Sequence, residues 1–502
     1  MGSRKRHVVI PLTFALIAVL ALFLLTVPSK DVNEPPGYTY GIVLDAGSSH
    51  TTMYVYKWTV DKQNGTGVVT QHSECSPKGG GISSYAWQPG EAARSLEECL
   101  DMAMKDIPRA RHHLTPVYLG ATAGMRLLNI SNPSGSDRIL GEVAEKIRSY
   151  PFDFQEAVIL SGQQEGAYGW VTVNYLMEKF IKYGFIGRWQ SANTETIGAL
   201  DLGGASTQIT FVTREAAEDP RNHMTLRLYG QDYKLYTHSF LCYGQGQMLI
   251  RLTASLTQFQ GYNGTIVHPC YPVGYSVTMK LSDVFDSPCT SAFRPSQPNL
   301  DVAVTVVGTG QYELCLRNVT QLFTFDKCPF SRCSFDGTFQ PKVKGEFVAF
   351  SAFYHAHRFL QRATGIKVTT PSQMDTAVRT LCAMSLSELK SKAPDEIKRL
   401  HEYCPSSAVV QILLLRGYSF DNTSFSQVSF ESTARGAAVG WALGYMLILS
   451  NMVPAESMNL VKAIVPVAWG CLLFLMIALL VVSLGYLLAQ AFCEKKTTDD
   501  IL

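Results

Sequence analysis

The stretch VLDAGSSHTTMYVY, residues 43–56, has the pattern of a buried strand, a sharp turn and a second strand. Asp45 ends the apolar run, and Gly47 with two serines forms the turn. The stretch ALDLGGASTQITFV, residues 199–212, repeats this plan around Asp201. A hairpin that recurs 156 residues later (201 minus 45) predicts two related α/β lobes that face each other.

Either turn alone has a structural explanation, because aspartate caps turns by bonding to the backbone and glycine permits a positive φ. The pair favours a chemical role. Glycine-rich turns let backbone N–H groups point at phosphate oxygens, and serine hydroxyls add donors. An aspartate beside each turn can hold a divalent cation, through water, against the same phosphates. The repeat therefore predicts a clamp for a polyphosphate and its metal between two lobes.

Two further turns carry polar groups that hydrolysis can use. Glu165, in SGQQEGAYGW at residues 161–170, follows a predicted strand and begins a predicted helix. It is either a general base or an acid that only favours the positive end of the helix, and spacing leaves both explanations open. Thr122 lies in a small-residue turn after another predicted strand, where a hydroxyl can contact a water bound to a metal.

Charge and motifs exclude several functions. A net charge of +2, from 43 basic and 41 acidic residues, gives no general attraction to nucleic acid, and we expect no nucleic-acid partner. The sequence contains no Gly-Lys dipeptide, which excludes a P-loop, and no G-x-S-x-G motif of the serine hydrolases. It also contains no C-x-x-C pair and no H-E-x-x-H motif, which argues against a zinc site.

Two segments have the composition of membrane spans. Residues 8–27 and residues 463–492 carry no charged side chain, and about 20 such residues suffice to cross a bilayer. We expect a retained anchor at residues 8–28 rather than a cleaved signal peptide, because no clear small-x-small site ends it. Basic residues outside both spans predict cytoplasmic tails at 1–7 and 493–502, with an extracellular region between the spans.

Sequons and cysteines support this topology. The five Asn-x-Ser/Thr acceptor sites all lie between the spans, at Asn64, Asn129, Asn263, Asn318 and Asn422. Ten of the twelve cysteines lie there too, and an even number outside the cytosol predicts five disulfides. Cys471 and Cys493, in or beside the second span, are expected to be free or acylated.

Periodicity predicts an α/β order for the extracellular region. Strands are expected at 40–44, 51–58, 116–120 and 157–162 and twice within 196–212, and helices at 90–107, 165–184, 345–364 and 438–451. Pro, Ser and Cys crowd residues 270–333, which we expect to be loops held by disulfides.

Five stretches in this order resemble the five apyrase-conserved regions of the ecto-nucleoside triphosphate diphosphohydrolases: VLDAGSSHT, YLGATAGMRLL, ILSGQQEGAYGWVTVNYL, ALDLGGASTQITF and AVGWALGYML. The stretches FIKYG, THSFLCYG and CPFSRCSFDG make the chain most similar to the type 2 ecto-ATPase, with type 8 as the next candidate. The resemblance implies two RNase H-like lobes of the actin, heat-shock-chaperone and sugar-kinase superfamily. The active site would lie in the cleft, and two transmembrane helices would flank the lobes.

The resemblance also implies roles for individual residues. Glu165 would activate water for in-line attack on the terminal phosphorus, with Ser206 and Gln208 positioning that water. The cation, Ca²⁺ or Mg²⁺, would be held mostly through its waters by Asp45, Asp201, Thr122 and Trp441. The phosphates would be cradled by Gly47, Ser48, Ser49 and His50 in one lobe and by Gly203, Gly204, Ala205 and Ser206 in the other.

The nucleobase side departs from the family pattern. The family has Tyr or Phe at the position that His355 occupies here, opposite Arg399 on the other face of the base. A histidine ring offers less stacking area and can carry a charge, and Tyr354 could replace it if the helix were rotated. The family's disulfide pairing would join Cys75 to Cys99, Cys242 to Cys289, Cys270 to Cys315, Cys328 to Cys333 and Cys382 to Cys404.

From the resemblance, lobe I is expected at 36–161 plus 427–461 and lobe II at 162–426. The expected protein is a plasma-membrane enzyme with both termini cytoplasmic. It would hydrolyse extracellular ATP in preference to ADP and so modulate purinergic signalling. Small residues in the second span permit a homo-oligomer. The alternatives are a type 8-like enzyme that also hydrolyses ADP, a nucleotide-binding surface protein without turnover, and a phosphotransferase of the same fold.

Overall fold

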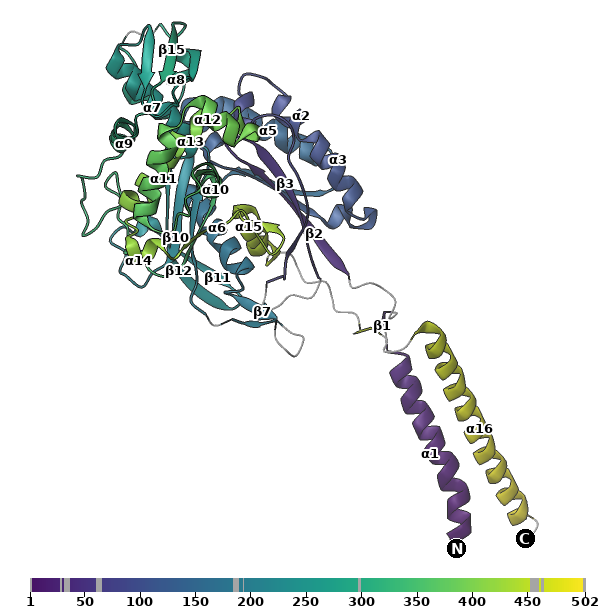
Figure 1. Ribbon diagram of the computed structural model, residues 1–502. Helices are drawn as coiled ribbons and strands as arrows, with labels where there is room; N and C mark the ends of the chain where they lie inside the picture. The colour runs from purple at the N-terminus through teal and green to yellow at the C-terminus, as the bar shows by residue number, and fades with distance from the viewer. Residues whose placement is uncertain are drawn as a thin grey trace. The chain divides into compact units, whose positions relative to one another are not determined.

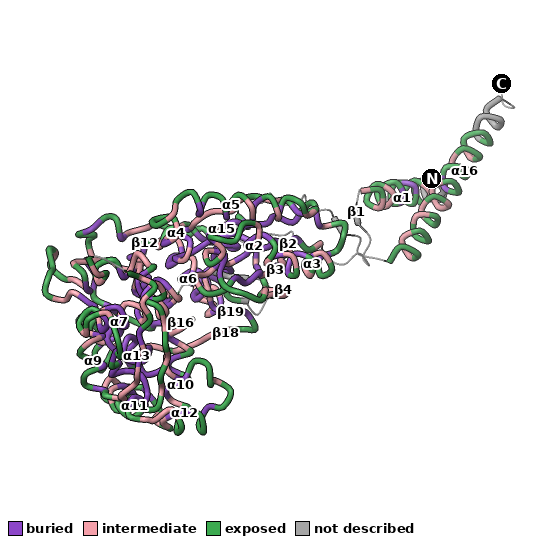
Figure 2. Tube along the Cα trace, turned by 90° about the horizontal axis from the view of Figure 1, so that it is seen from above, coloured by how far each residue is buried: buried purple, intermediate pink, exposed green. Residues whose placement is uncertain are grey.

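A computed structural model describes residues 2–27, 29–30, 37–59, 66–183, 189–192, 194–296, 299–451, 460–461 and 465–499. Contacts between Cα atoms divide the chain into one unit of Met1–Tyr38 with Ala455–Leu502 and a second unit of Thr39–Pro454. In the first unit, helices α1 (Gly2–Leu25) and α16 (Pro466–Asp499) contain Val8–Leu25 and Pro466–Cys493, which are long and apolar enough to cross a membrane. Most of their described side chains are exposed or partly exposed (Figure 2), as expected of helices that face lipid.

A five-stranded sheet forms the first half of the second unit. Its order is β4-β3-β2-β5-β6, and β5 pairs in parallel with both β2 and β6. The strands are β2 (Tyr38–Ala46), β3 (Thr51–Thr59), β4 (Thr70–Cys75), β5 (Pro116–Ala121) and β6 (Asp153–Ile159). The associated helices are α2 (Glu91–Ser95), α3 (Glu97–Asp106), α4 (Ala123–Ser131) and α5 (Pro133–Arg148).

A six-stranded sheet organises the second half, in the order β11-β12-β10-β9-β16-β17. Strands β9 and β10 form an antiparallel hairpin, whereas β16 pairs in parallel with β9 and with β17. The strands are β9 (Gly198–Leu202), β10 (Ser206–Val212), β11 (His223–Leu228), β12 (Gln231–Leu241), β16 (Phe347–Ser351) and β17 (Val428–Phe430). The larger helices are α7 (Gln245–Gln260), α10 (Ala352–Thr364), α11 (Pro371–Ala383), α12 (Leu386–Lys392) and α13 (Tyr403–Ile412).

The two sheets repeat one plan. In each, a hairpin is followed by two parallel strands added on the side of its first strand, so that β2, β3, β5 and β6 correspond to β9, β10, β16 and β17. After the last strand of each set comes one apolar helix, α6 (Gly162–Leu176) or α15 (Trp441–Ser450), and these two pack against each other between the sheets (Figure 1). This is the two-lobe α/β fold that the repeated hairpin predicted. The lobe boundaries after 161 and 426 stay a prediction.

Three expectations need correction. The helix expected at 345–364 begins only at Ala352, because residues 347–351 form β16, which is buried between neighbouring strands and has no alternation to distinguish it from a helix. The helix expected at 165–184 ends at Leu176, and Ile181–Tyr183 forms strand β7, paired with β8 (Trp189–Ser191). The helix expected at 90–107 is interrupted at Leu96.

The region 270–333 is more regular than the loops we expected. A three-stranded sheet of β13 (Thr265–His268), β15 (Ala303–Gly308) and β14 (Ser276–Lys280) is joined to helices α8 (Leu281–Phe285) and α9 (Tyr312–Thr320). The structure contains five disulfides in the expected pairing: Cys75–Cys99, Cys242–Cys289, Cys270–Cys315, Cys328–Cys333 and Cys382–Cys404. Cys471 and Cys493 are exposed on α16 and lie outside these bonds.

The remaining short elements are α14 (Asn422–Phe425) and the pair β18 (Thr433–Ala434) and β19 (Ala437–Ala438) in the second unit, and β1 (Ser29–Lys30) with β20 (Leu460–Val461) in the first. Of the five acceptor asparagines, Asn129, Asn263 and Asn422 are exposed and Asn318 is partly exposed. Asn64 lies outside the described residues.

Close packing of α6 against α15 predicts a steric effect on stability. A Cβ added to Gly444 would lie 1.9 Å from the backbone oxygen of Tyr168. Gly444→Ala should therefore lower the free energy of unfolding by about 1–3 kcal/mol, although alanine is the better helix former. The control is Gly141→Ala in α5, where a Cβ meets no atom within 4 Å. That change should be neutral or stabilising by up to about 1 kcal/mol. Thermal unfolding of both variants measures the difference, and equal effects would contradict the close packing.

Candidate functional site

The repeated turns meet at a cavity of about 690 Å³ in the second unit. Fifteen of the predicted site residues line it: Asp45, Gly47, Ser48, Ser49, His50, Thr122, Glu165, Asp201, Gly203, Gly204, Ala205, Ser206, His355, Arg399 and Trp441. Only Gln208 of that set is absent from the lining. The structure therefore brings together residues that are up to 396 positions apart in the chain (441 minus 45).

The two turns lie in contact across the cavity. A Cβ on Gly204 would be 2.6 Å from Ser48 Oγ, so a side chain there would displace the Ser48 hydroxyl from its present position. The carbonyls of Gly203 and Gly204 accept hydrogen bonds from the N–H groups of Gln245 and Gln247, at 2.9 and 3.0 Å. Because C=O and N–H of one peptide point in opposite directions, the N–H groups of Gly204 and Ala205 face away from α7. This is the orientation that a phosphate-binding turn requires.

Helix α6 places Glu165 at the cavity. Its first turn is fixed by a capping box, in which Gln164 N donates to Ser161 Oγ at 3.2 Å and Ser161 N donates to Gln164 Oε1 at 2.9 Å. Gly162 and Gly166 let the helix lie close to the sheet, because a Cβ at Gly166 would be 2.6 Å from a hydroxyl of β10. The side chain of Glu165 is thereby buried but reaches the cavity.

Three carboxyl groups converge at this point: Asp45, Glu165 and Asp201. Burial, followed by the charges of Glu165 and Asp201, raises the pKa of Asp45 well above its usual range, and a hydrogen bond from Trp441 partly opposes this. Burial and then the charge of Glu165 raise the pKa of Asp201 to about 7. Burial also raises the pKa of Glu165. Without a bound ligand, the charged forms of these acids are therefore destabilised, and an additional positive charge would stabilise them.

Arg126 is a site residue that sequence reasoning missed. From α4, its Nη2 donates to Glu165 Oε2 at 2.8 Å and to Ser206 Oγ at 2.9 Å, and its Nη1 donates to the Leu160 carbonyl at 3.1 Å. The interaction with Arg126 lowers the pKa of Glu165 against the larger effect of burial. A signal was present, since Arg126 is the basic residue of the stretch YLGATAGMRLL and follows Thr122 by four residues, about one helical turn.

Gln208 acts from behind the cavity wall. Its Nε2 donates to Ser206 Oγ at 2.7 Å and to Ser239 Oγ at 2.9 Å, which orients the Ser206 hydroxyl. The Oε1 atom of Gln208 is buried and accepts no hydrogen bond from the described residues. Ser206 thus receives hydrogen bonds from both Gln208 and Arg126, so its own hydroxyl proton can be donated elsewhere.

The acids and the oxygen ligands beside them fit a divalent cation. Asp201 Oδ1 is buried without a hydrogen-bond partner among the described residues, which is an incomplete state for a carboxylate oxygen. Asp45 and Thr122 line the same cavity from the other sheet. Carboxylate and hydroxyl oxygens are the ligands that Ca²⁺ and Mg²⁺ prefer. The raised pKa values of the acids and the unpartnered Oδ1 of Asp201 are therefore consistent with a divalent cation bound here.

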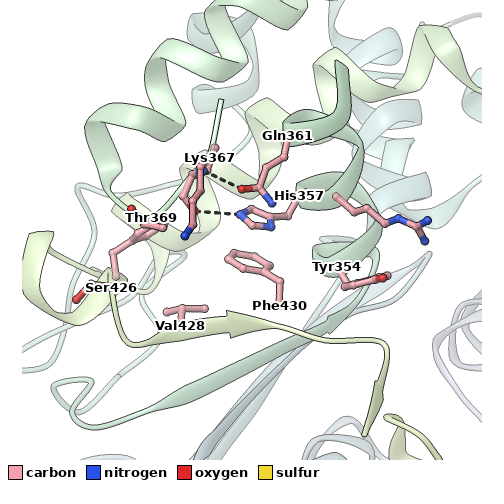
Figure 3. Close-up of a pocket in the computed structure, with 11 residues that line it drawn as sticks. Tyr354, His357, Gln361, Lys367, Thr369, Ser426, Val428 and Phe430 are labelled. Carbon is pink, nitrogen blue, oxygen red and sulfur yellow. Dashed lines mark hydrogen bonds between the residues drawn. The ribbon is translucent and has the colours of Figure 1, made fainter. Parts of the chain in front are cut away.

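Helix α10 separates two cavities. His355 lines the large cavity with Arg399, whereas Tyr354 lines a smaller one of about 330 Å³ with His357 and Phe430 (Figure 3). Tyr354 therefore does not take the place of His355 beside Arg399. Burial and then the charge of Arg399 lower the pKa of His355, so its ring is neutral at physiological pH. The guanidinium of Arg399 is held by Glu402, with Nε to Oε2 at 3.0 Å.

Comparison with known sequences finds one protein family and relatives that share one class of name. The sequence profile of the GDA1/CD39 (nucleoside phosphatase) family matches residues 32–463. The ectonucleoside triphosphate diphosphohydrolase 2 of Mus musculus is 50% identical over 495 residues, which cover 99% of either chain. The ectonucleoside triphosphate diphosphohydrolase 8 of Gallus gallus is 45% identical over 481 residues, which cover 95% of this chain and 96% of that protein.

Comparison with solved structures supports the fold. A crystal structure of nucleoside triphosphate hydrolases from Neospora caninum aligns with a TM-score of 0.58 at 14% sequence identity. The alignment covers 83% of this chain and 93% of that chain. At this identity the likeness concerns the arrangement of the two lobes only.

The raised pKa of Asp201 predicts that, when a chelator removes divalent cations, this residue lowers the free energy of unfolding by an amount that depends on pH. Its folded pKa of about 7 lies above its ordinary value of 3.8. Between these pH values the folded protein binds a proton that the unfolded chain has lost, so the free energy of unfolding falls as pH rises. Above about pH 7 the whole loss of stability remains. With EDTA at pH 8, Asp201→Asn should therefore raise the unfolding temperature, by an amount equivalent to a few kcal/mol.

At pH 4 the same substitution should have little effect, since Asp201 is then largely protonated in the folded protein and close to half protonated in the unfolded chain. The control is Asp232→Asn, at an exposed ion pair with Arg227, which should change the unfolding temperature little at either pH. Thermal unfolding across pH 4–8 measures both. An Asp201→Asn effect that is independent of pH would contradict the assigned cause.

Proposed function

The chain belongs to the GDA1/CD39 (nucleoside phosphatase) family, and from that membership we propose that it hydrolyses extracellular nucleoside triphosphates, ATP in preference to ADP, at the cavity between its two lobes. The products are phosphate and the lower nucleotide. The observation that carries the proposal is Glu165, a buried acid that faces the cavity between two phosphate-binding turns. A protein that only binds nucleotides needs the turns but no such base.

The chain's own residues perform the steps as follows. The turns at Gly47–His50 and Gly203–Ser206 bind the phosphate chain through backbone N–H groups and hydroxyls. Ser206, oriented by Gln208 and Arg126, positions a water in line with the terminal phosphorus. Glu165 accepts a proton from that water as it attacks, and the lower nucleotide leaves from the opposite side. Arg126 holds the Glu165 carboxylate in place.

Asp45, Asp201, Thr122 and Trp441 would hold a divalent cation, Ca²⁺ or Mg²⁺, mostly through its waters. The cation supplies positive charge that neutralises the phosphate oxygens in the transition state. The convergence of three acids supports this requirement, because an anionic substrate would otherwise be repelled by Asp45, Glu165 and Asp201. His355 and Arg399 would bind the two faces of the nucleobase.

The two apolar helices and the disulfides support a location at the cell surface. We place the enzyme in the plasma membrane with both termini cytoplasmic and the cavity outside the cell, where it terminates or modulates purinergic signalling. Glycans at the exposed acceptor asparagines would be consistent with this location. Gly470 and Gly485 on α16 are exposed and would allow close packing between helices of a homo-oligomer, whereas Ser483 is buried within the protein.

Two other functions differ in measurable ways. A type 8-like enzyme would hydrolyse ATP and ADP at similar rates, and a phosphotransferase would need an acceptor to release the phosphate. Phosphate release from ATP by intact cells that express the chain, with and without chelator, separates hydrolysis from binding alone. Similar rates with ATP and ADP would favour the type 8-like alternative over the proposed preference.

Replacing the base tests the mechanism. Glu165→Gln keeps the shape of the side chain but cannot accept the proton, so kcat should fall by a factor of about 100 to 10,000. Binding of a non-hydrolysable ATP analogue should persist, because the turns are unchanged. Glu145→Gln on the exposed side of α5 is the control and should leave kcat unchanged. Turnover of Glu165→Gln within a few-fold of the wild type would remove Glu165 from the role of base.

The nucleobase assignment makes a separate prediction. His355→Tyr enlarges the stacking surface, and a base–aromatic contact of about 1 kcal/mol should lower KM for ATP by about fivefold with little change in kcat. His355→Ala should raise KM. Tyr354→Ala, in the other cavity, is the control and should leave KM unchanged. Steady-state kinetics measures all three, and a response of KM at Tyr354 rather than His355 would reverse the assignment.

A further inference from the structure

Ser351 has a strained backbone at the junction of β16 and α10. Its φ of 55° and ψ of −129° belong to a region that glycine enters freely and other residues enter at a cost. It is the N-cap residue of α10, yet its side chain makes no capping hydrogen bond to that helix. Ser351 lines the large cavity. A strained residue whose hydroxyl is not used for its own helix needs another explanation.

The duplicated fold supplies a counterpart. β5 corresponds to β16, and the residue at the start of the following helix is Thr122 in one lobe and Ser351 in the other. Thr122 is likewise the N-cap residue of its helix, α4, and its side chain makes no capping hydrogen bond. Each hydroxyl residue therefore lies at the end of the strand that pairs with an aspartate-bearing strand, β2 with Asp45 or β9 with Asp201.

The two lobes differ by one residue in register. Asp45 is paired with Gly120, so Thr122 comes two positions later and a regular strand would place it on the same face as Asp45. Asp201 is paired with Phe350, so Ser351 comes only one position later and a regular strand would turn it to the opposite face. The left-handed backbone at Ser351 reverses this direction, and its side chain lies near enough to Asp201 to lower the pKa of that carboxyl.

We infer that Ser351 is a positioning residue, whose hydroxyl holds the Asp201 carboxylate in the orientation needed to receive the divalent cation. The inference rests on the proposed function, because it assigns Asp201 to that cation. A hydrogen bond from the Ser351 hydroxyl to Oδ2 would leave Oδ1, which is buried and has no partner among the described residues, for the cation and its waters. A hydrogen bond of this kind to a ligand raises metal affinity because it fixes the geometry of the ligand in advance.

Two substitutions separate the hydroxyl from the backbone. Ser351→Gly removes the hydroxyl and relieves the strain, whereas Ser351→Ala removes the hydroxyl and keeps the strain. The full-length protein in detergent is titrated with Ca²⁺, following ATP hydrolysis and, in separate samples without nucleotide, the rise in unfolding temperature. We expect both variants to need about tenfold more Ca²⁺ than the wild type in both measurements. In chelator, Ser351→Gly should unfold at a higher temperature than Ser351→Ala.

A merely structural role would give a different result. If only the backbone conformation mattered, Ser351→Gly would keep the wild-type Ca²⁺ dependence in both measurements, and this outcome would overturn the inference. Asp201→Asn distinguishes the inference from the proposed function. Full hydrolysis by Asp201→Asn would refute the assignment of the cation to Asp201. Loss of hydrolysis by Asp201→Asn together with unchanged Ca²⁺ dependence in both Ser351 variants would refute only the role of Ser351.

Discussion

The burial of three carboxyl groups, Asp45, Glu165 and Asp201, beside one cavity is the constraint on which the rest of the site depends. Burial raises the pKa of all three acids, and the charge of Glu165 adds to this at Asp45 and Asp201, so their charged forms are costly unless positive charge arrives with the ligand. Arg126 supplies one charge and directs it to Glu165. The remaining two acids, one from each lobe, are the ones that we propose for the cation. The same arrangement is consistent with the proposal that phosphate groups enter this cavity together with a divalent cation.

Much of the fold was predictable because it is duplicated. One hairpin is a weak signal, but the same hairpin around Asp45 and Asp201 indicated two lobes, and the sheets confirm this. The failures have local causes. Strand β16 is buried and has no alternation, so its apolar residues merged in the sequence with the amphipathic helix that follows and the two resembled one helix. Cysteine and proline density suggested loops at 270–333, but strand β15 lies inside that range.

Only part of the candidate site could be predicted from the sequence. Residues on the turns could be found from spacing, since turn chemistry depends on neighbours in the chain. Arg126 was missed because its partners, Glu165 and Ser206, are 39 and 80 positions away. Ser351 was missed because its role arises from a backbone angle, which the residue type does not indicate. His355 was assigned from the resemblance alone, and only the placement of α10 between two cavities separates it from Tyr354.

Helices α6 and α15 occupy equivalent places in the two lobes and touch each other at Gly444 and Tyr168. A clamp with perfect twofold symmetry could receive a linear polyphosphate from either end. The two helices differ at their first turns, however, where one presents Glu165 and the other Trp441. His355 and Arg399 also lie on the side of one lobe only, so the two ends of the cavity are different. If the cavity binds nucleotides as proposed, this difference would fix the direction in which the phosphate chain enters, through a few side chains on a nearly symmetric frame.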